Sequence, residues 1–271
     1  MSTRFPFTAP DSYALNCSTL LTELDVLSRP AAAREAGFTA VEFWWPFDGT
    51  PVPSQDDVDG FIRALDEAGV QLTGLNFWAG TMSAGDRGVV SHFSRRSEFA
   101  DNIEVVTEIG RRTGCRAFNA LYGLRQEDSS EQEQDDVAVA NLVAAAKAVA
   151  SIDGTVLLEP VSGAEGYPLK TAADALAIIG RVQEAGAQNI RLLADFYHLA
   201  VNGDDVAAVI EAHAADFGHI QIADAPGRGA PGTGELPLQQ WIQRSLDLGY
   251  AGGVALEYKQ DRTTAFDWLA G

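Results

Sequence analysis

Short apolar segments alternate with longer segments of helical periodicity along most of the chain. In the longer segments apolar residues recur three or four positions apart, as at Val58, Phe61 and Leu65, which is the spacing of one helix face. The short segments have the length and composition of β-strands, and they cover residues 13–17, 40–43, 71–76, 117–119, 156–160, 190–195, 219–223 and 253–257. Strands that alternate with helices predict βα units and a parallel sheet.

The number of βα units favours a closed barrel over an open sheet. Eight units in roughly 250 residues match a (β/α)₈ TIM barrel, whereas a doubly wound sheet of about six strands would leave units unplaced. We therefore predict the α/β class and a single TIM-barrel domain over residues 1–271, in which residues 1–10 form a loosely ordered N-terminal extension. The acidic segment 126–136 precedes an Ala-rich helical segment, so we interpret it as a solvated loop and helix start rather than a linker.

Charge and apolar content limit the partners. The chain carries 19 Lys and Arg against 38 Asp and Glu, a formal net charge of −19, so its average surface repels nucleic acid and anionic lipid. No stretch approaches the ~18 apolar residues that span a bilayer, and residues 1–10 lack the apolar core of a signal peptide. Cys17 and Cys115 are expected to be buried free thiols. We expect a cytoplasmic protein without nucleic-acid or membrane partners, and the aromatic residues Trp44 and Trp45, taken as exposed, favour a homo-oligomer.

Polar residues end four neighbouring apolar segments in the second half of the chain. They are Glu159, Asp195, Gln221 and Glu257. The carboxyl ends of TIM-barrel strands meet at one mouth, so we expect these side chains to converge there. Three carboxylates in one place repel one another unless a cation or protons neutralise them, and oxygen ligands select a hard divalent ion, Mg²⁺ or Mn²⁺, over Zn²⁺. The alternative is that each acid is an ordinary strand-end charge, satisfied by an arginine or a helix N-terminus.

A histidine and several cations follow the same strand ends. His198 comes three positions after Asp195 and is a candidate for contact with a substrate or for support of a ligand. Arg228 lies in the irregular Gly- and Pro-rich segment 226–235, where it either binds a substrate carboxylate in a bidentate manner or forms a surface salt bridge. Two further candidates for binding an anion are Lys259 and Arg87.

Other polar residues near these strand ends have structural alternatives. Glu42 and the aromatic segment 43–47 either wall the pocket or belong to the core or an interface. His219 is expected to be a core or supporting histidine, because strand alternation sends its side chain to the same face as that of Gln221. The two remaining histidines, expected at the surface, are His92 and His213.

Several stretches of the second half resemble one family. They are Leu158-Glu159-Pro160, Asp195-Phe196-Tyr197-His198, His219-Ile220-Gln221-Ile222-Ala223-Asp224, Arg228-Gly229-Ala230-Pro231-Gly232-Thr233-Gly234-Glu235 and Glu257-Tyr258-Lys259. Together they resemble the hydroxypyruvate isomerase family of the xylose-isomerase-like barrels. The resemblance implies a metal site at Glu159, Asp195, Gln221 and Glu257. It also implies that Glu159 and Glu257 transfer protons and that His198 and Arg228 contact the substrate.

The activity that the resemblance implies is a metal-assisted isomerisation. The expected reaction interconverts hydroxypyruvate and tartronate semialdehyde, or a close 2-oxo acid, by proton transfer through an enediolate. Mg²⁺ or Mn²⁺ is the expected cofactor, and a small hydroxy-oxo acid is the expected partner. A 2-oxo-tetronate isomerase and a ketose 3-epimerase are alternatives of the same class, although the epimerases of this superfamily usually carry His where this chain has Gln221. A non-catalytic sugar-acid binding protein is an alternative of another class.

Overall fold

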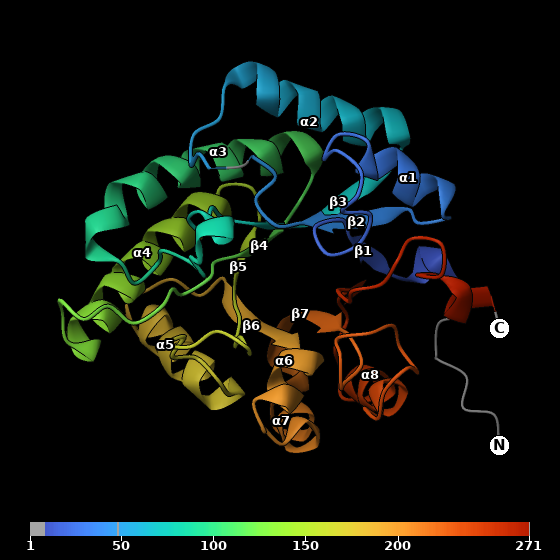
Figure 1. The fold of residues 1–271 in the computed structure, drawn as a ribbon. Coiled ribbons are helices and arrows are strands. Elements are labelled where there is room, and N and C mark those ends of the chain that lie inside the picture. Colours follow the sequence, from blue (N-terminus) through green and yellow to red (C-terminus); the bar gives the residue numbers. More distant parts are fainter. Residues whose placement is uncertain (1–8, 48, 271) are drawn as a thin grey trace.

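Parallel strands form the centre of the computed structural model, which describes residues 9–47 and 49–270. They are β1 (Ala14–Asn16), β2 (Ala40–Phe43), β3 (Gln71–Asn76), β4 (Ala117–Asn119), β5 (Thr155–Leu158), β6 (Ile190–Asp195), β7 (Phe217–Ile222) and β8 (Val254–Leu256). Each strand pairs with its neighbour in the chain, and β8 pairs with β1, so the sheet closes into a barrel (Figure 1). The predicted TIM barrel is confirmed.

Two strands end earlier than the sequence suggested. β5 ends at Leu158 and β8 ends at Leu256, whereas the predicted strands extended to residues 160 and 257. Pro160 has no backbone N–H to contribute to a ladder, which is consistent with the early end of β5. Glu159 and Glu257 are therefore the first residues after their strands, at the carboxyl-terminal mouth of the barrel.

Helices surround the barrel (Figure 1). They are α1 (Arg29–Glu35), α2 (Gln55–Ala68), α3 (Arg96–Thr113), α4 (Glu131–Ala150), α5 (Ala172–Glu184), α6 (Phe196–Val201), α7 (Val206–His213) and α8 (Leu238–Asp247). At the start of α4, the Ser130 side chain accepts from the Glu133 N–H and the Glu133 carboxylate accepts from the Ser130 N–H. The acidic segment 126–136 is thus a loop and a capped helix start, as expected.

The pairing of β2 with β3 is irregular at Glu42, whose carboxyl group is buried. The register shifts between Val41 and Glu42, and Glu42 then pairs with Gly74. A Cβ atom at residue 74 would lie 3.1 Å from both Cβ and Oε2 of Glu42. Glycine at this position therefore leaves room for the buried carboxyl group of Glu42.

The C-terminal turn packs against the beginning of the barrel. The rings of Trp268 and Tyr13 meet edge to face, with centroids 5.7 Å apart. The expected extension over residues 1–10 falls largely on residues 1–8, which lie outside the described residues. Pro10 begins a short 3₁₀ turn (Pro10–Ser12) that leads into β1.

Two expectations about exposed aromatic residues are wrong. His92 is buried, and its Nε2 atom lies 3.0 Å from the carbonyl oxygen of Leu124. Trp44 and Trp45 are half-buried, and Trp45 packs edge to face on Phe47 at 5.0 Å. Folding these rings back onto the barrel removes apolar area from water. Exposed tryptophans therefore give no support to the predicted homo-oligomer.

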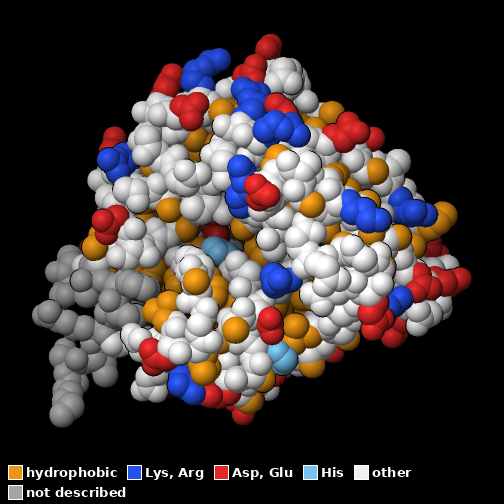
Figure 2. Space-filling model, turned by 180° about the vertical axis from the view of Figure 1, so that it is seen from behind, with side chains coloured by type: hydrophobic (Ala, Val, Ile, Leu, Met, Phe, Trp, Pro, Cys, Tyr) orange, Lys and Arg blue, Asp and Glu red, His pale blue; other side chains and the backbone are white. Residues whose placement is uncertain are grey.

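Charges of both signs are distributed over the surface. Figure 2 shows Lys and Arg side chains interspersed with Asp and Glu on the face opposite to the view of Figure 1. Cys17 and Cys115 are buried free thiols, as expected. Among the described residues, no helix is both long enough and apolar enough to cross a membrane.

Candidate active site

The mouth of the barrel holds a cavity of about 650 Å³. Its polar lining comes from the ends of several strands and from the loops that follow them. The lining includes Asn76, Arg87, Glu159, Ser162, His198, Arg228, Glu257 and Lys259. A neighbouring cavity of about 360 Å³ shares some of its walls, among them Trp44 and Asn76. The cavity therefore lies where TIM-barrel enzymes place their active sites.

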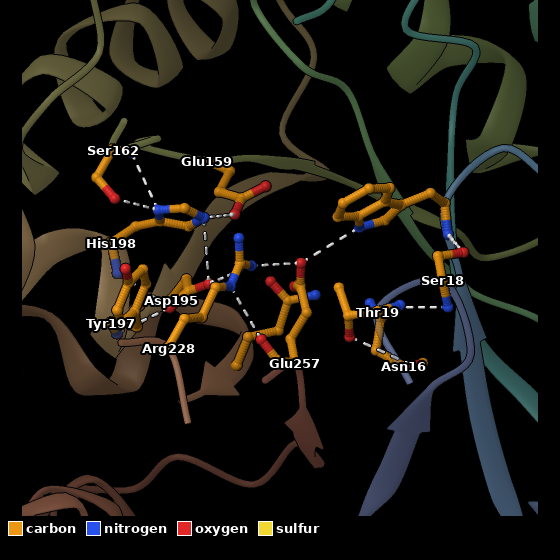
Figure 3. A network of polar contacts seen from close by, with 12 residues as sticks. Asn16, Ser18, Thr19, Glu159, Ser162, Asp195, Tyr197, His198, Arg228 and Glu257 are labelled. Atoms are coloured by element: carbon orange, nitrogen blue, oxygen red, sulfur yellow. Dashed lines mark hydrogen bonds and ion pairs between the residues drawn. The ribbon is translucent and has the colours of Figure 1, made fainter. Parts of the chain in front are cut away.

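Two carboxylates and a histidine form a compact group at this mouth. Glu159, Asp195 and His198 offer ligand atoms that all lie within 4.8 Å of one another, and all three side chains are buried. His198 Nε2 is 3.8 Å from Glu159 Oε1 and 3.6 Å from Asp195 Oδ2 (Figure 3). Asp195 Oδ1 accepts hydrogen bonds from the N–H groups of Tyr197 and His198, which caps α6. Sequence proximity thus explains how β6 and α6 place Asp195 and His198 together.

The loop after β5 fixes the tautomer of His198. The Ser162 backbone N–H donates to His198 Nδ1 at 3.0 Å, and the Ser162 hydroxyl lies 2.7 Å from the same atom (Figure 3). Because Nδ1 accepts, a neutral ring carries its proton on Nε2, which faces the two carboxylates. Burial lowers the pKa of His198 to about 4, so the ring is neutral near pH 7. No pattern in the sequence indicated Ser162.

Glu159 is a carboxyl group whose surroundings favour the protonated form. Its Oε2 atom accepts a hydrogen bond from Asn119 Nδ2 at 2.7 Å. Burial, followed by the negative charge of Asp195, raises the pKa of Glu159 to about 8. Asn119 is the last residue of β4, as Asp195 is of β6, but it was not among the predicted site residues.

Glu257 is held by a cation and an indole. Arg228 Nη2 donates to Glu257 Oε1 at 2.7 Å, and Trp44 Nε1 lies 3.2 Å from the same oxygen. The guanidinium lies between Glu257 and Asp195, with Nη2 3.8 Å from Asp195 Oδ2 (Figure 3). Burial raises the pKa of Glu257 well above its usual range, although Arg228 opposes the shift.

Arg228 is an internal cation rather than part of a surface salt bridge. Its side chain is 14% exposed, and its guanidinium lies 5.4 Å from the ring centroid of Tyr197. The backbone of Arg228 adopts a φ of 55°, and the preceding Gly227 has a φ of 100°. These two residues form a left-handed turn, in which Gly227 adopts its positive φ without strain. The turn places the Arg228 side chain in the cavity wall.

Gln221 and His219 project from β7 toward a carboxylate on β2. Gln221 Nε2 donates to Glu42 Oε1 at 2.7 Å, and His219 Nε2 lies 2.7 Å from Glu42 Oε2. Glu42 and His219 are therefore partners inside the barrel, 177 positions apart in the sequence. This contact assigns His219 to the supporting role that the sequence left open.

The oxygen donors at the mouth fit a hard divalent cation. Asp195 Oδ2 and Gln221 Oε1 are buried and have no hydrogen-bond partner in the described part of the chain. The β6–β7 register pairs Asp195 with Gln221, so their side chains leave the sheet on the same face. Buried oxygens without a donor are costly unless a cation or water satisfies them, and an oxygen set is suited to Mg²⁺ or Mn²⁺.

The two remaining predicted cations border the same cavity. Lys259 lies two positions after Glu257 in the loop that follows β8, and its backbone N–H donates to the carbonyl oxygen of Arg228. Arg87 Nη1 donates to the backbone carbonyls of Met82 and Asp86, which fixes the guanidinium at the wall. Most of the predicted site residues therefore line one cavity: Glu159, His198, Arg228, Glu257, Lys259 and Arg87. Asp195 and Gln221 are buried register partners on β6 and β7 and are not part of that lining. Arg228 separates Glu257 from the Glu159–Asp195–His198 group.

Comparisons with known proteins place this architecture in a family. A family model described as "Xylose isomerase-like TIM barrel" matches residues 30–270. A Streptomyces coelicolor protein named "Putative hydroxypyruvate isomerase" is 48% identical over 268 residues, which cover 96% of each chain. A Cupriavidus necator protein named "2-oxo-tetronate isomerase" is 32% identical over 95% of this chain and 96% of its own.

A solved structure supports the same assignment. It is titled as an AP endonuclease of family 2 from Brucella melitensis and superimposes with a TM-score of 0.84 at 29% identity. The superposition covers 96% of this chain and 98% of that one. Like its two sequence relatives, this protein is an isomerase, and the chain belongs to the xylose isomerase-like TIM barrel family.

Proposed function

We propose that this isomerase interconverts hydroxypyruvate and tartronate semialdehyde with the help of Mg²⁺ or Mn²⁺. The observation that carries the proposal is the pair Glu159 and Glu257. Both carboxyl groups are buried, both line the same cavity, and both have a raised pKa. A carboxyl group whose pKa is raised keeps its proton at a higher pH than a free carboxyl group does, which is suited to general acid–base catalysis. The name of the relative at 48% identity supports the choice of substrate.

Four side chains would hold the cation: Glu159, Asp195, Gln221 and Glu257. A bound divalent cation would polarise the substrate carbonyl and thereby make the neighbouring C–H group more acidic. The unpaired oxygens of Asp195 and Gln221 support this ligand set. The positive charge also relieves the repulsion among the three carboxylates.

The two glutamates would move the carbon-bound protons. One removes a proton from C3 of hydroxypyruvate, which leaves an enediolate, and the other delivers a proton to C2. The hydroxyl proton passes from the C3 oxygen to the C2 oxygen, so substrate and product have the same atoms. His198 donates a hydrogen bond from Nε2 to a substrate oxygen. Each positioned acid or base contributes about 10²–10⁴-fold to the rate.

Three cations would orient the substrate. We assign the substrate carboxylate to Arg228, whose Nη1 atom has no acceptor among the described residues while its Nε and Nη2 atoms bind Glu257. Lys259 and Arg87 add positive charge to the same cavity wall. Arginine and lysine donors favour an anionic hydroxy-oxo acid over a neutral sugar.

A small-molecule substrate also agrees with the surface charge. The formal net charge is −19, and the face in Figure 2 carries both signs of charge interspersed. Binding of a nucleic-acid backbone depends on a basic surface, so we propose that this chain does not act on DNA.

The decisive experiment follows solvent deuterium into the substrate. Purified protein is stripped with EDTA, reloaded with Mg²⁺ or Mn²⁺ and incubated with hydroxypyruvate in D₂O, and both carbons are followed by NMR. We expect interconversion by the unmutated protein and none by Glu159→Gln or Glu257→Gln. The variant that keeps the base for C3 should still exchange deuterium there, whereas the other should not. Full turnover by either variant would refute the two-base scheme, and no turnover on hydroxypyruvate would refute the substrate.

A 2-oxo-tetronate is the second candidate substrate. The Cupriavidus relative is named for it. The seven non-hydrogen atoms of hydroxypyruvate would fill roughly 200 Å³ if each took the ≈30 Å³ of a water molecule. The cavity of about 650 Å³ is larger than this and therefore has room for a longer acid. A higher kcat/KM for the four-carbon acid than for hydroxypyruvate would select this candidate.

A further inference from the structure

We infer that Glu42 is a positioning residue that holds the Gln221 amide with its oxygen toward the cation site. The inference rests on the proposed metal dependence and concerns a residue outside the proposed ligand set. Glu42 is 3% exposed, neither it nor Gln221 is part of the cavity lining, and the Glu42 carboxylate accepts a hydrogen bond from Gln221. It therefore acts through Gln221 rather than on a substrate.

The contact between the two side chains selects one orientation of the amide. The oxygen and nitrogen of a glutamine amide have nearly the same size, so shape alone does not distinguish the two flips. Gln221 Nε2 donates to Glu42 Oε1 at 2.7 Å, and the same oxygen accepts from the Asn16 amide, so it is an acceptor toward both side chains. The flip that would bring Gln221 Oε1 to Glu42 is therefore excluded by repulsion between two acceptors. Gln221 Oε1 is left buried and without a hydrogen-bond partner among the described residues.

The carboxylate of Glu42 is itself held from two other sides. Asn16 Nδ2 donates to Oε1 at 2.7 Å, and His219 Nε2 lies 2.7 Å from Oε2. The Asn16 amide cannot flip without loss, because its Oδ1 atom accepts from the backbone N–H groups of Ser18 and Thr19 at 2.9 and 3.2 Å (Figure 3). A backbone N–H has a fixed direction. The backbone of the loop after β1 thus fixes the Asn16 amide, Asn16 donates to Glu42, and Glu42 in turn accepts from Gln221.

The sheet is shaped to admit this carboxylate. A buried charge is costly unless several donors satisfy it, and Glu42 has a donor or donor ring at each oxygen. The β2–β3 register shifts at Glu42, and residue 74 is a glycine against which Glu42 packs. Residues that orient metal ligands typically contribute about 10–100-fold to metal affinity.

The test measures Mn²⁺ binding rather than turnover. The full-length protein is stripped with EDTA and titrated with Mn²⁺, and water-proton relaxation reports how many waters the bound ion keeps. Glu42→Met removes the acceptor at similar length, Glu42→Gln keeps a carbonyl acceptor, and Gln221→Met removes the proposed ligand oxygen. Glu104→Met changes an exposed carboxylate on α3 and is the matched control.

We expect Glu42→Met to bind Mn²⁺ about 10–100-fold more weakly and to gain a water on the ion, as Gln221→Met does. Glu42→Gln should bind Mn²⁺ as tightly as the unmutated protein and leave the same number of waters on the ion, because its side-chain carbonyl can accept from Asn16 and Gln221. Loss of packing alone would lower thermal stability in Glu42→Met without adding a water. An unchanged affinity and water number in Glu42→Met would overturn the inference.

A second measurement does not depend on the folding of Glu42→Met. In metal-free protein labelled with ¹⁵N-glutamine, the Gln221 amide protons, assigned by their absence in Gln221→Met, should be shifted downfield and protected from exchange. Amide protons that resemble those of a solvated glutamine would overturn the inference. Protected amide protons together with no Mn²⁺ binding by the unmutated protein would instead refute the proposed metal dependence.

Discussion

Replacing Glu159 by glutamine should stabilise the metal-free protein at alkaline pH and leave it nearly unchanged at acidic pH. Burial and the charge of Asp195 raise the pKa of Glu159 from its ordinary 4.5 to about 8. Because the folded-state pKa lies above the unfolded-state value, the carboxyl group contributes stability that is fully present below pH 4.5. This contribution is lost as the pH rises through about 8. Glutamine imitates the protonated carboxyl group and can still accept from Asn119.

The magnitude follows from the size of the pKa shift. Each pKa unit corresponds to about 1.4 kcal/mol, so ionisation of Glu159 costs the folded protein on the order of 4 kcal/mol at slightly alkaline pH. That is a large share of the roughly 5–15 kcal/mol by which domains are stable. Removal of the Glu159 charge also eases the ionisation of Glu257, which acts in the same direction.

Urea unfolding in EDTA-containing buffers across this pH range provides the assay. The free energy of unfolding of Glu159→Gln minus that of the unmutated protein should rise by about 1.4 kcal/mol per pH unit between the two pKa values. Glu104→Gln, at an exposed position on α3, should show no such slope. A difference that is flat, or that grows toward low pH, would refute the reasoning about burial.

The remaining predictions concern the barrel, the cation and the indole. Gly74→Ala should lower the free energy of unfolding by about 1–3 kcal/mol, because its Cβ would press on Glu42 at 3.1 Å. Gly180→Ala in α5, where a Cβ meets nothing within 4 Å, should instead raise it by about 0.5–1 kcal/mol, and urea unfolding checks both. Treatment with EDTA should abolish turnover, and Mn²⁺ at about 100 times its Kd should stabilise the protein by ~2.7 kcal/mol in thermal unfolding. Trp44→Phe should lower kcat roughly tenfold in steady-state kinetics, because it removes a hydrogen bond to the Glu257 carboxylate.

Specific results would contradict each of these expectations. Unchanged stability of Gly74→Ala would mean that the close approach to Glu42 is relieved at no cost. Full turnover after EDTA treatment would remove the cation from the mechanism. A raised KM with unchanged kcat in Trp44→Phe would assign the indole to substrate binding rather than to Glu257.

The sequence by itself determined the barrel and the residues at its mouth. Hydrophobic periodicity separates strands from helices, and in a barrel whose strands follow chain order, consecutive strands are neighbours. Polar residues near the ends of those strands are then expected at one rim, which is why the sequence predicts that Glu159, Asp195, Gln221 and Glu257 lie close together. The exact ends of β5 and β8 could not be predicted, because a strand ends where its backbone hydrogen bonds stop, which hydrophobic periodicity does not record.

Only the tertiary structure decided how these side chains are paired and charged. The proton position on His198 follows from a backbone N–H in the loop after β5, and the orientation of Gln221 follows from a carboxylate 179 positions away. Burial sets the raised pKa of Glu159, and packing buries His92, which the sequence placed at the surface. Periodicity records which face a residue occupies, whereas hydrogen-bond geometry and desolvation depend on distances of a few tenths of an ångström between segments remote in the chain.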